Sequence, residues 1–270
     1  MLSIAGSDSG GGAGIQADIK TITMLGCYAA SCITSVTAQN TTGVYGAWDL
    51  APEVVEKQMV AVLSDMKIDA IKIGMLPPSL VETVTRLIPE GIPVILDPVM
   101  VSTSGFQLVD VSEFVENISG LLKRASLLTP NIPEAERISG LRICTRQDVI
   151  RAGEAIRCLG AGRVLVKGGH CSDEEYVEDV LLTENGMLCF KNARIPRRVH
   201  GTGCTLSSAI ASFVACGMSI EESVESAIGY LGSTMRTIPK VGRGDNPVFH
   251  SYTLFSGVAP APLHKHNTLS

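Results

Sequence analysis

The sequence predicts an α/β protein with a mainly parallel central sheet and helices on both faces of that sheet. Two observations support this fold class. Short apolar runs alternate with patterns of helical period almost from end to end of the 270 residues. Several of the apolar runs stop at a polar residue. Such alternation is typical of parallel strands joined by crossover helices, and proteins of this class bind ligands beyond the carboxyl ends of the strands.

Each expected strand is an apolar run, and each expected helix has apolar residues at helical spacing or a capping signal at its start. The predicted strands are residues 2–5, 32–37, 70–73, 93–96, 126–128 and 163–166, followed by a hairpin of residues 177–182 and 187–190. The predicted helices are residues 15–25, 54–66 and 145–159, two that start near Ser79 and Asp110, one that starts near Gly203, and one from Ser219 to about Ile238. A glutamate three residues after Ser79, Asp110 and Ser219 predicts a cap at each of these starts.

The composition excludes several classes of protein. An apolar share of 45% with 18% charged residues excludes wholesale disorder. The net charge of −5 argues against a nucleic-acid or membrane surface, and no apolar run approaches the roughly 20 residues of a membrane span. The eight cysteines contain no C-x-x-C pair, and the N-terminus lacks the basic segment of a signal peptide. We therefore expect a cytoplasmic protein without nucleic-acid or membrane partners.

One domain is expected over residues 1–241, because the alternation of strands and helices runs to that point. Beyond Gly242 the periodicity is lost and prolines recur. Residues 242–270 are therefore expected to be a tail or linker that is partly disordered.

The most informative stretch is the turn His-Gly-Thr-Gly-Cys-Thr at residues 200–205, directly before a buried helix. Gly201 and Gly203 leave the first amides of this helix open to a ligand, with the positive end of the helix dipole behind them. Such a site suits a phosphate, or oxygens that gain charge during phosphoryl transfer. Cys204 lies in the first turn, where the dipole is expected to lower the pKa of its thiol. A plain tight turn is the alternative, and the absence of Gly-Lys-Ser/Thr excludes a Walker A loop.

A glycine-rich loop, residues 6–14, follows the first strand. Residues 12–17 match G-x-G-x-x-A, but the second strand ends in Gln39-Asn40 rather than in the acid that would hold a ribose. The loop therefore fits the close approach of a small ligand better than it fits NAD. The amides of Gln39 and Asn40 offer paired donors and acceptors for the edge of an aminopyrimidine-like ring, with a local Asx turn as the alternative.

Further polar residues fall at or near the ends of other strands. Asp97 follows one apolar strand, and Asn131 and Glu134 follow another. The two carboxylates suit Mg²⁺, directly or through water, although Asn131-x-x-Glu134 is also an ordinary capping box. Lys167 ends a further strand and suits a phosphate. Lys72 lies inside a buried strand, where a lysine has either a partner or a function.

Seven motifs occur in a fixed order along the chain: AGSDSGGGAGIQAD at 5–18, TAQNT at 37–41, KIGML at 72–76, DPVM at 97–100, TPNIPEA at 129–135, KGGH at 167–170 and HGTGCT at 200–205. Together they resemble the hydroxymethylpyrimidine/phosphomethylpyrimidine kinases of thiamine synthesis, which belong to the ribokinase-like superfamily. The resemblance covers about residues 2–239. It implies a ribokinase-like fold and the ATP-dependent phosphorylation of 4-amino-5-hydroxymethyl-2-methylpyrimidine, and then of its monophosphate to the diphosphate.

The resemblance also implies roles for particular residues. The expected substrate-binding residues are Gly6, Asp8, Ala13, Gln39, Met75 and Val99, with Gln39 on the pyrimidine edge. The expected ATP and phosphate residues are Asn131, Lys167, Gly201 and Gly203, and the expected Mg²⁺ ligands are Asp97 and Glu134. The expected catalytic turn is Gly201, Thr202, Gly203 and Cys204. Cys204 replaces the Asp of most of the superfamily, and it acts either as the base for the substrate hydroxyl or through its position alone.

Two departures from the family pattern and two rival functions stay open. Val199 stands where family members usually have Thr, and the tail after Asn246 matches nothing in the kinase. The nearest rival is a pyridoxal kinase, and the alternative of another class is a catalytically silent pyrimidine-binding protein. Gln39 and Cys204 favour the pyrimidine enzyme. The resemblance further implies a homodimer.

Overall fold

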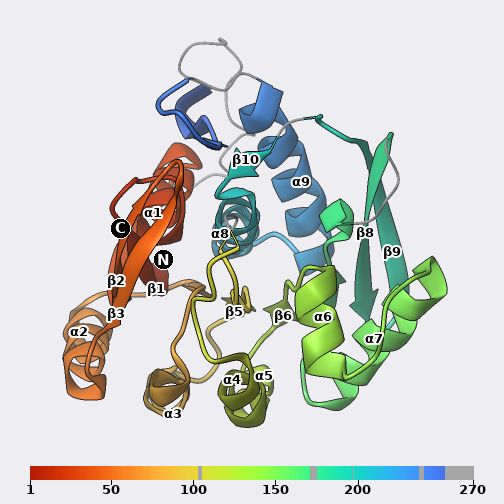
Figure 1. Cartoon of the computed structure of the whole chain (residues 1–270). Helices are drawn as coiled ribbons and strands as arrows, with labels where there is room; N and C mark the ends of the chain where they lie inside the picture. The colour runs from red at the N-terminus through yellow and green to blue at the C-terminus, as the bar shows by residue number, and fades with distance from the viewer. Residues whose placement is uncertain (103–104, 171–174, 197, 237–239, 253–270) are drawn as a thin grey trace, which may run out of the picture.

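The computed structural model describes residues 1–102, 105–170, 175–196, 198–236 and 240–252. A nine-stranded sheet separates two layers of helices (Figure 1). The strand order is β3-β2-β1-β4-β5-β6-β7-β8-β9. Neighbours from β2 to β7 pair in parallel, whereas β3 at one edge and β8 and β9 at the other pair antiparallel. The predicted mainly parallel sheet with helices on both faces is confirmed.

The central strands are buried on both faces, which is why they are apolar runs in the sequence, interrupted only by Lys72 in β4. The strands of the sheet are β1 (Leu2–Asp8), β2 (Ala30–Asn40), β3 (Gly43–Asp49), β4 (Ile71–Ile73), β5 (Val94–Leu96), β6 (Leu127–Leu128), β7 (Val164–Val166), β8 (Tyr176–Thr183) and β9 (Gly186–Ala193). β1 and β2 run beyond their predicted ends, because polar residues such as Asp8 and Gln39 still pair with neighbouring strands. β3 was not predicted.

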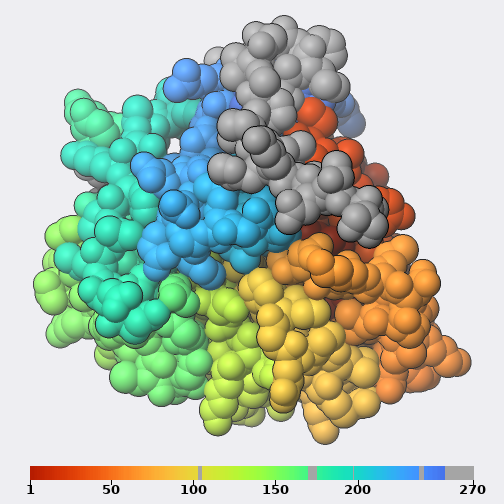
Figure 2. Space-filling model, turned by 180° about the vertical axis from the view of Figure 1, so that it is seen from behind, coloured from red at the N-terminus to blue at the C-terminus, as the bar shows by residue number. Residues whose placement is uncertain are grey.

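Two hydrophobic cores lie on opposite faces of the sheet. One core is built with α2 (Pro52–Asp65), α3 (Pro78–Leu87), α4 (Val111–Asn117), α5 (Ser119–Leu122), α6 (Ile132–Ser139) and α7 (Arg146–Cys158). The other core is built with α1 (Gly14–Met24), α8 (Thr202–Ala215) and α9 (Ile220–Arg236). Residues 205–213 of α8 are all buried, and α9, in blue at the centre of Figure 2, covers the outside of this layer.

The helix predicted to start near Ser79 is confirmed, but the cap predicted at Ser79 is wrong. Asp110 caps α4 by accepting from the amide of Glu113 at 3.0 Å, and Ser219 and Glu222 hydrogen-bond to each other at the start of α9. Ser79 caps nothing, because α3 begins one residue earlier, at Pro78. The ring of a proline presets the helical φ, so that the Pro77-Pro78 pair starts the helix without a side-chain cap. The predicted end of the last helix at Ile238 lies outside the described residues.

The C-terminal segment, residues 240–252, packs onto the domain. Its strand β11 (Asn246–Pro247) pairs in parallel with β10 (Val199–His200), and His250 is buried with Nε2 3.0 Å from Thr205 Oγ1. This differs from the predicted tail beginning at residue 242. A two-residue strand has no periodicity, so the sequence pattern gives no sign of it. Residues 253–270 are not described. Among the described residues, no helix is both long and apolar enough to cross a membrane.

Candidate active site

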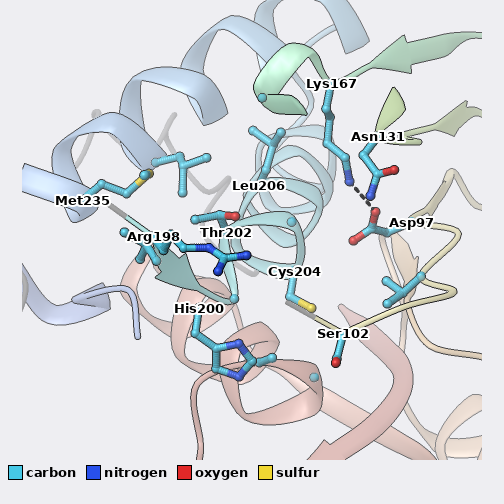
Figure 3. A pocket seen from close by; sticks show the side chains of 18 of the residues that line it. Asp97, Ser102, Asn131, Lys167, Arg198, His200, Thr202, Cys204, Leu206 and Met235 are labelled. Carbon is cyan, nitrogen blue, oxygen red and sulfur yellow. Dashed lines mark hydrogen bonds and ion pairs between the residues drawn. The ribbon is translucent and has the colours of Figure 1, made fainter. Parts of the chain in front are cut away.

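A cavity of about 590 Å³ opens at the carboxyl ends of the parallel strands, in front of the first turn of α8 (Figure 3). Every residue expected in the site lines it: Gly6, Asp8, Ala13, Gln39, Met75, Asp97, Val99, Asn131, Glu134, Lys167, Gly201, Thr202, Gly203 and Cys204. The structure therefore brings together residues from seven separate motifs, as the rule for parallel sheets predicts. Lys72 and Asn40 are the exceptions among the polar residues that we singled out, because Lys72 is fully buried beneath the cavity and Asn40 is exposed outside it.

The turn before α8 leaves the helix amides open. Gly201 is the N-cap residue, with φ +84°. Because glycine has no side chain, no side-chain cap covers the helix amides. A Cβ at Gly201 would overlap the carbonyl of Gly12, so that only glycine fits between these two loops. No acidic residue occupies the first turn. The first amides and the positive end of a 14-residue helix therefore face the cavity as an anion site.

An ion pair stands at the mouth of α8. Lys167 Nζ lies 2.8 Å from Asp97 Oδ1, and Asp97 also accepts from Thr129. Burial alone would raise the pKa of Asp97, but the charges of Lys167 and Lys72 hold it below its usual value. A Cβ added at Gly203 would lie 3.5 Å from both Asp97 Oδ2 and Lys167 Nζ. A phosphate on the helix amides would therefore touch the lysine as well.

Glu134 and Asn131 form the capping box of α6. Glu134 Oε2 accepts from the amide of Asn131 at 2.8 Å, and Asn131 Oδ1 accepts from the amide of Glu134 at 2.9 Å. Burial raises the pKa of Glu134 to about 7; Asp97 adds to the shift and Lys167 opposes it. Two buried carboxylates that disfavour each other's charge are a donor set that suits a hard divalent cation. The capping role and a metal role are therefore compatible.

Cys204 does not have the lowered pKa expected of a thiol at a helix N-terminus. Burial raises its pKa to about 11; Lys72 lowers it and Asp18 raises it. The helix dipole acts on this thiol, but the loss of water outweighs it. A pKa of about 11 favours the protonated thiol near neutral pH, which argues against a resting thiolate base.

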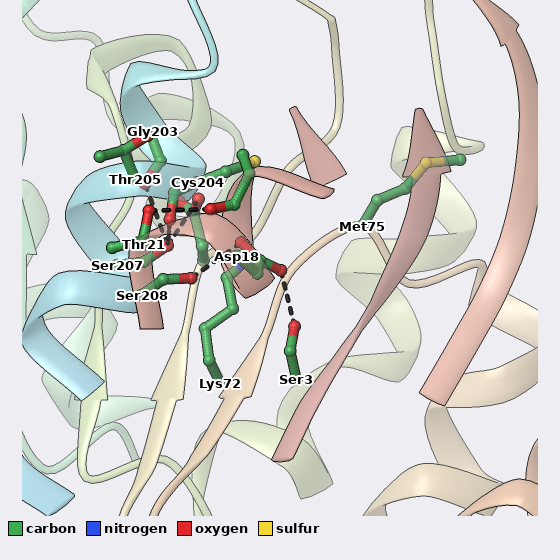
Figure 4. Close-up of polar contacts among 12 residues, drawn as sticks. Ser3, Asp18, Thr21, Lys72, Met75, Gly203, Cys204, Thr205, Ser207 and Ser208 are labelled. Carbon is green, nitrogen blue, oxygen red and sulfur yellow. Dashed lines mark hydrogen bonds and ion pairs between the residues drawn. The ribbon is translucent and has the colours of Figure 1, made fainter. Parts of the chain in front are cut away.

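A buried polar network lies directly beneath Cys204 (Figure 4). Lys72 Nζ is 2.9 Å from both carboxylate oxygens of Asp18, which also accepts from Ser3 and Ser208. The neighbouring charges raise the pKa of Lys72 in spite of burial, so it stays charged. The expectation that Lys72 has a partner is confirmed. The network joins β1, β4, α1 and α8 below the site, and it places a paired lysine and aspartate under the anion turn.

The far end of the cavity is bounded by the glycine-rich loop and β2. Asp8 organises the loop: its carboxylate accepts from the amides of Gly10, Gly12 and Ala13 at 2.7–2.9 Å. These bonds occupy both oxygens, so Asp8 shapes the pocket rather than offering a free carboxylate. The Gln39 side chain contacts His200 at 2.8 Å. Met75 lies against Gly6, where a Cβ would come 2.8 Å from its sulfur.

Sequence reasoning missed part of the cavity wall. An apolar surface also lines the cavity, formed by Ile228, Leu231 and Met235 of α9, Val177 of β8, and Ile195. The α9 residues share a helical face, but that face is indistinguishable from a core stripe in the sequence. His200 and Arg198 also line the cavity, and we assigned neither a role. The sequence offered a signal for His200, since this residue opens the glycine-turn motif at 200–205.

A parallel sheet with open helix amides, a lysine–aspartate pair and a ring-sized pocket in one cleft defines a ribokinase-like phosphotransferase. The family model for phosphomethylpyrimidine kinase matches residues 8–249. The chain belongs to this family.

Named relatives and solved structures agree. The chain is 44% identical to the hydroxymethylpyrimidine/phosphomethylpyrimidine kinase of Rhizobium meliloti, over 92% of this chain and 96% of the relative. It is 42% identical to the thiamine biosynthesis bifunctional protein ThiED of Geobacter sulfurreducens, over 93% of this chain; it spans about half of that longer protein, 52%. The crystal structure of phosphomethylpyrimidine kinase from Clostridium difficile 630 matches with TM-score 0.76 and 41% identity, covering 87% of this chain and 98% of that one. The pyridoxal kinase of Staphylococcus aureus in complex with AMP-PCP matches with TM-score 0.84 and 30% identity, covering 92% of each.

Proposed function

We propose that the chain transfers a phosphoryl group from ATP to 4-amino-5-hydroxymethyl-2-methylpyrimidine, and then a second one to the monophosphate, in thiamine biosynthesis. The observation that carries this proposal is the position of the α8 amides. They lie in one cavity between the Asp97–Lys167 pair and the Gln39 amide. A donor phosphate and an acceptor ring bound at these two ends would meet at the anion turn, which stabilises the charge of the migrating group.

Each end has a chemistry that fits one substrate. Gln39, Met75 and Val99 provide an amide and apolar surface for a flat polar ring. At the other end, Lys167, Asn131 and the amides of Gly201 and Gly203 are donors for ATP phosphates. The apolar wall from α9 then borders the adenine. The solved structure of the Staphylococcus aureus pyridoxal kinase in complex with AMP-PCP supports ATP as the donor.

Asp97 and Glu134 would hold Mg²⁺, directly or through water. Bound there, the ion would neutralise phosphate charge during the transfer. The raised pKa of Glu134 supports this role, because an apposed cation offsets the cost of its buried charge. Cys204 contributes through its position beside the reacting groups, since its thiol is not ionised near neutral pH.

Release of ADP tests the proposal against both rivals. The purified chain is given ATP, Mg²⁺ and, in separate reactions, the hydroxymethylpyrimidine, its monophosphate or pyridoxal. We expect turnover with both pyrimidines, and weaker turnover with pyridoxal. Turnover with pyridoxal alone would establish the pyridoxal kinase. Tight pyrimidine binding without ADP release would establish a silent binding protein.

The proposal includes a homodimer in the cytoplasm. The edge strand β3 carries Tyr45 and Trp48, which are 69% and 61% exposed in the single chain, and this apolar surface supports self-association. The cysteines of the described residues are free, which suits a reducing compartment. Light scattering on the purified protein, compared with Trp48→Lys, measures the oligomeric state. A monomeric wild-type protein would contradict the dimer.

A further inference from the structure

His200 lies between the two polar side chains at the acceptor end of the cavity. Its Nε2 atom is 2.8 Å from Gln39 Nε2 and 3.2 Å from Asp8 Oδ2. One ring nitrogen cannot serve both neighbours in the same way. A lone pair accepts an N–H of the Gln39 amide, whereas an N–H donates to Asp8. The protonation of His200 Nε2 therefore determines whether the Gln39 amide turns its nitrogen or its oxygen toward the imidazole.

The fold leaves the imidazole little freedom. His200 is buried, and its backbone in β10 pairs with Pro247 of β11. On the other side, a Cβ at Gly12 would overlap His200 Cδ2 and would lie 3.1 Å from Pro247 Cβ. The ring is therefore confined between the glycine-rich loop and the C-terminal segment, at hydrogen-bonding distance from Gln39.

The backbone already supplies the Asp8 carboxylate with three hydrogen-bond donors besides its contact with His200. Its Oδ2 atom already accepts from the amides of Gly12 and Ala13 at 2.9 and 2.8 Å, and Oδ1 accepts from Gly10 at 2.7 Å. The contact of His200 with Gln39 is also the shorter of the two. Both observations favour the arrangement in which the Nε2 lone pair faces the Gln39 amide.

We propose that His200 is a positioning residue, which accepts one N–H of the Gln39 amide and thereby selects a 4-aminopyrimidine over a 4-oxopyrimidine. This inference rests on the proposed function, in which Gln39 contacts the ring edge. With one N–H held by His200, the amide presents Oε1 as an acceptor and its second N–H as a donor. That pair complements an exocyclic amine beside a ring nitrogen.

A 4-oxo ring presents the opposite pattern, a carbonyl acceptor beside a ring N–H donor. To pair with it, the Gln39 amide must turn over and place Oε1 against the His200 lone pair. The turned amide then either leaves two acceptors facing each other in a buried place or requires the imidazole proton to move to Nε2, and each outcome costs free energy. Discrimination therefore comes from the wrong ring being penalised, as well as from the right ring being bound.

The test compares kcat/KM for the hydroxymethylpyrimidine and for its 4-oxo analogue. In His200→Leu we expect the preference for the amino ring to fall about tenfold or more. Leucine has no lone pair to accept from the Gln39 amide, so the turned amide is no longer penalised. In His200→Gln, whose Oε1 can accept from Gln39, we expect the preference to stay within about threefold of wild type. The KM for ATP should be unchanged in both. An unchanged preference in His200→Leu would overturn the inference.

Two further measurements separate this inference from the proposed function. Gln39→Ala should lower kcat/KM for the pyrimidine, and in that background His200→Leu should no longer alter the preference between the rings. If Gln39→Ala has no effect, the proposed role of Gln39 fails and the inference fails with it; if only His200→Leu has no effect, the inference alone fails. Should His200→Leu not fold, nitrogen-15 NMR of the wild-type protein with the pyrimidine bound decides. An Nε2 without a proton supports the inference, and a protonated Nε2 contradicts it.

Discussion

In the proposed function, recognition of the ring depends on Gln39. In Gln39→Ala we expect the KM for the pyrimidine to rise about tenfold or more, because one or two hydrogen bonds worth about 1 kcal/mol each are lost. The KM for ATP should stay nearly constant, since Gln39 lies at the other end of the cavity from Lys167. Steady-state kinetics with each substrate varied in turn measures both values.

The adjacent Asn40 offers a matched control. It is an exposed amide whose Oδ1 accepts from Thr42, and it does not line the cavity. Asn40→Ala should therefore leave both KM values unchanged. Equal losses of pyrimidine and ATP binding in Gln39→Ala would refute the assigned role.

Cys204 gives a second prediction at this scale. Cys204→Ala should lower kcat more than it weakens the binding of either ligand, because the thiol lies beside the reacting groups. With a pKa of about 11, the thiol keeps its proton up to alkaline pH. The kcat profiles of wild type and Cys204→Ser should therefore run parallel from about pH 6 to about pH 9.

Two outcomes would contradict this account of Cys204. An unchanged kcat in Cys204→Ala would show that the thiol is only a packing residue. A rise of kcat with pH that is present in wild type and absent from Cys204→Ser would show that the thiolate is the base.

At the scale of the element, the turn before α8 is the part of the fold that tolerates least change. Gly201→Ala places a side chain at φ +84° and against the carbonyl of Gly12. We expect loss of about 1–3 kcal/mol of stability from backbone strain, together with a marked fall in kcat as the helix amides move. Thermal unfolding and ADP release measure the two effects.

Gly229 in α9 is the matched control for that substitution. A Cβ there meets nothing within 4 Å, and the residue lies inside a helix. Gly229→Ala should therefore raise stability by about 0.5–1 kcal/mol and leave kcat unchanged. A Gly201→Ala protein with wild-type kcat would show that the open amides are not essential.

At the scale of the whole molecule, His250 in the C-terminal segment is expected to make the free energy of unfolding depend on pH. Burial, with a smaller contribution from Lys20, lowers the pKa of His250 from 6.5 to about 4. The folded state therefore prefers the neutral ring. The resulting stabilisation is fully present above about pH 6.5 and is lost as the pH falls through about 4, on the order of 3 kcal/mol in total.

The measurement is urea unfolding at several pH values in wild type and His250→Gln. The glutamine can still pair with Thr205 but does not titrate. We expect its unfolding free energy to depend less on pH than that of wild type between about pH 6.5 and about pH 4. Parallel curves for the two proteins would show that His250 does not stabilise the packed segment.

The sheet order could not be derived from the sequence, but its parallel character could, because β4 to β7 are wholly buried and are apolar apart from Lys72. Strand-end positions such as Asp97 and Lys167 followed from the same logic. The edge strand β3 was missed, since it is half-exposed and its residues mix polar and aromatic types. β10 and β11 are too short to have a pattern.

Long-range contacts were the main source of error at the site. The dipole argument predicted a lowered pKa for Cys204 and is wrong, because burial of the thiol raises its pKa. The partnership of His200 with Gln39 spans 161 positions in sequence and leaves no trace in either motif. The location of the site was thus predictable from strand ends, whereas its protonation states required the packing.

The peptide of Gly12 rests directly on Gly201, without space for a methyl group between them. The glycine-rich loop and the turn before α8 are therefore in contact backbone to backbone, so that a shift of one must move the other. Divergence toward other rings is confined to the surrounding side chains, such as Met75 and Val99. In the proposed function, the distance between the two substrate sites would therefore be the same in any relative that keeps these two glycines.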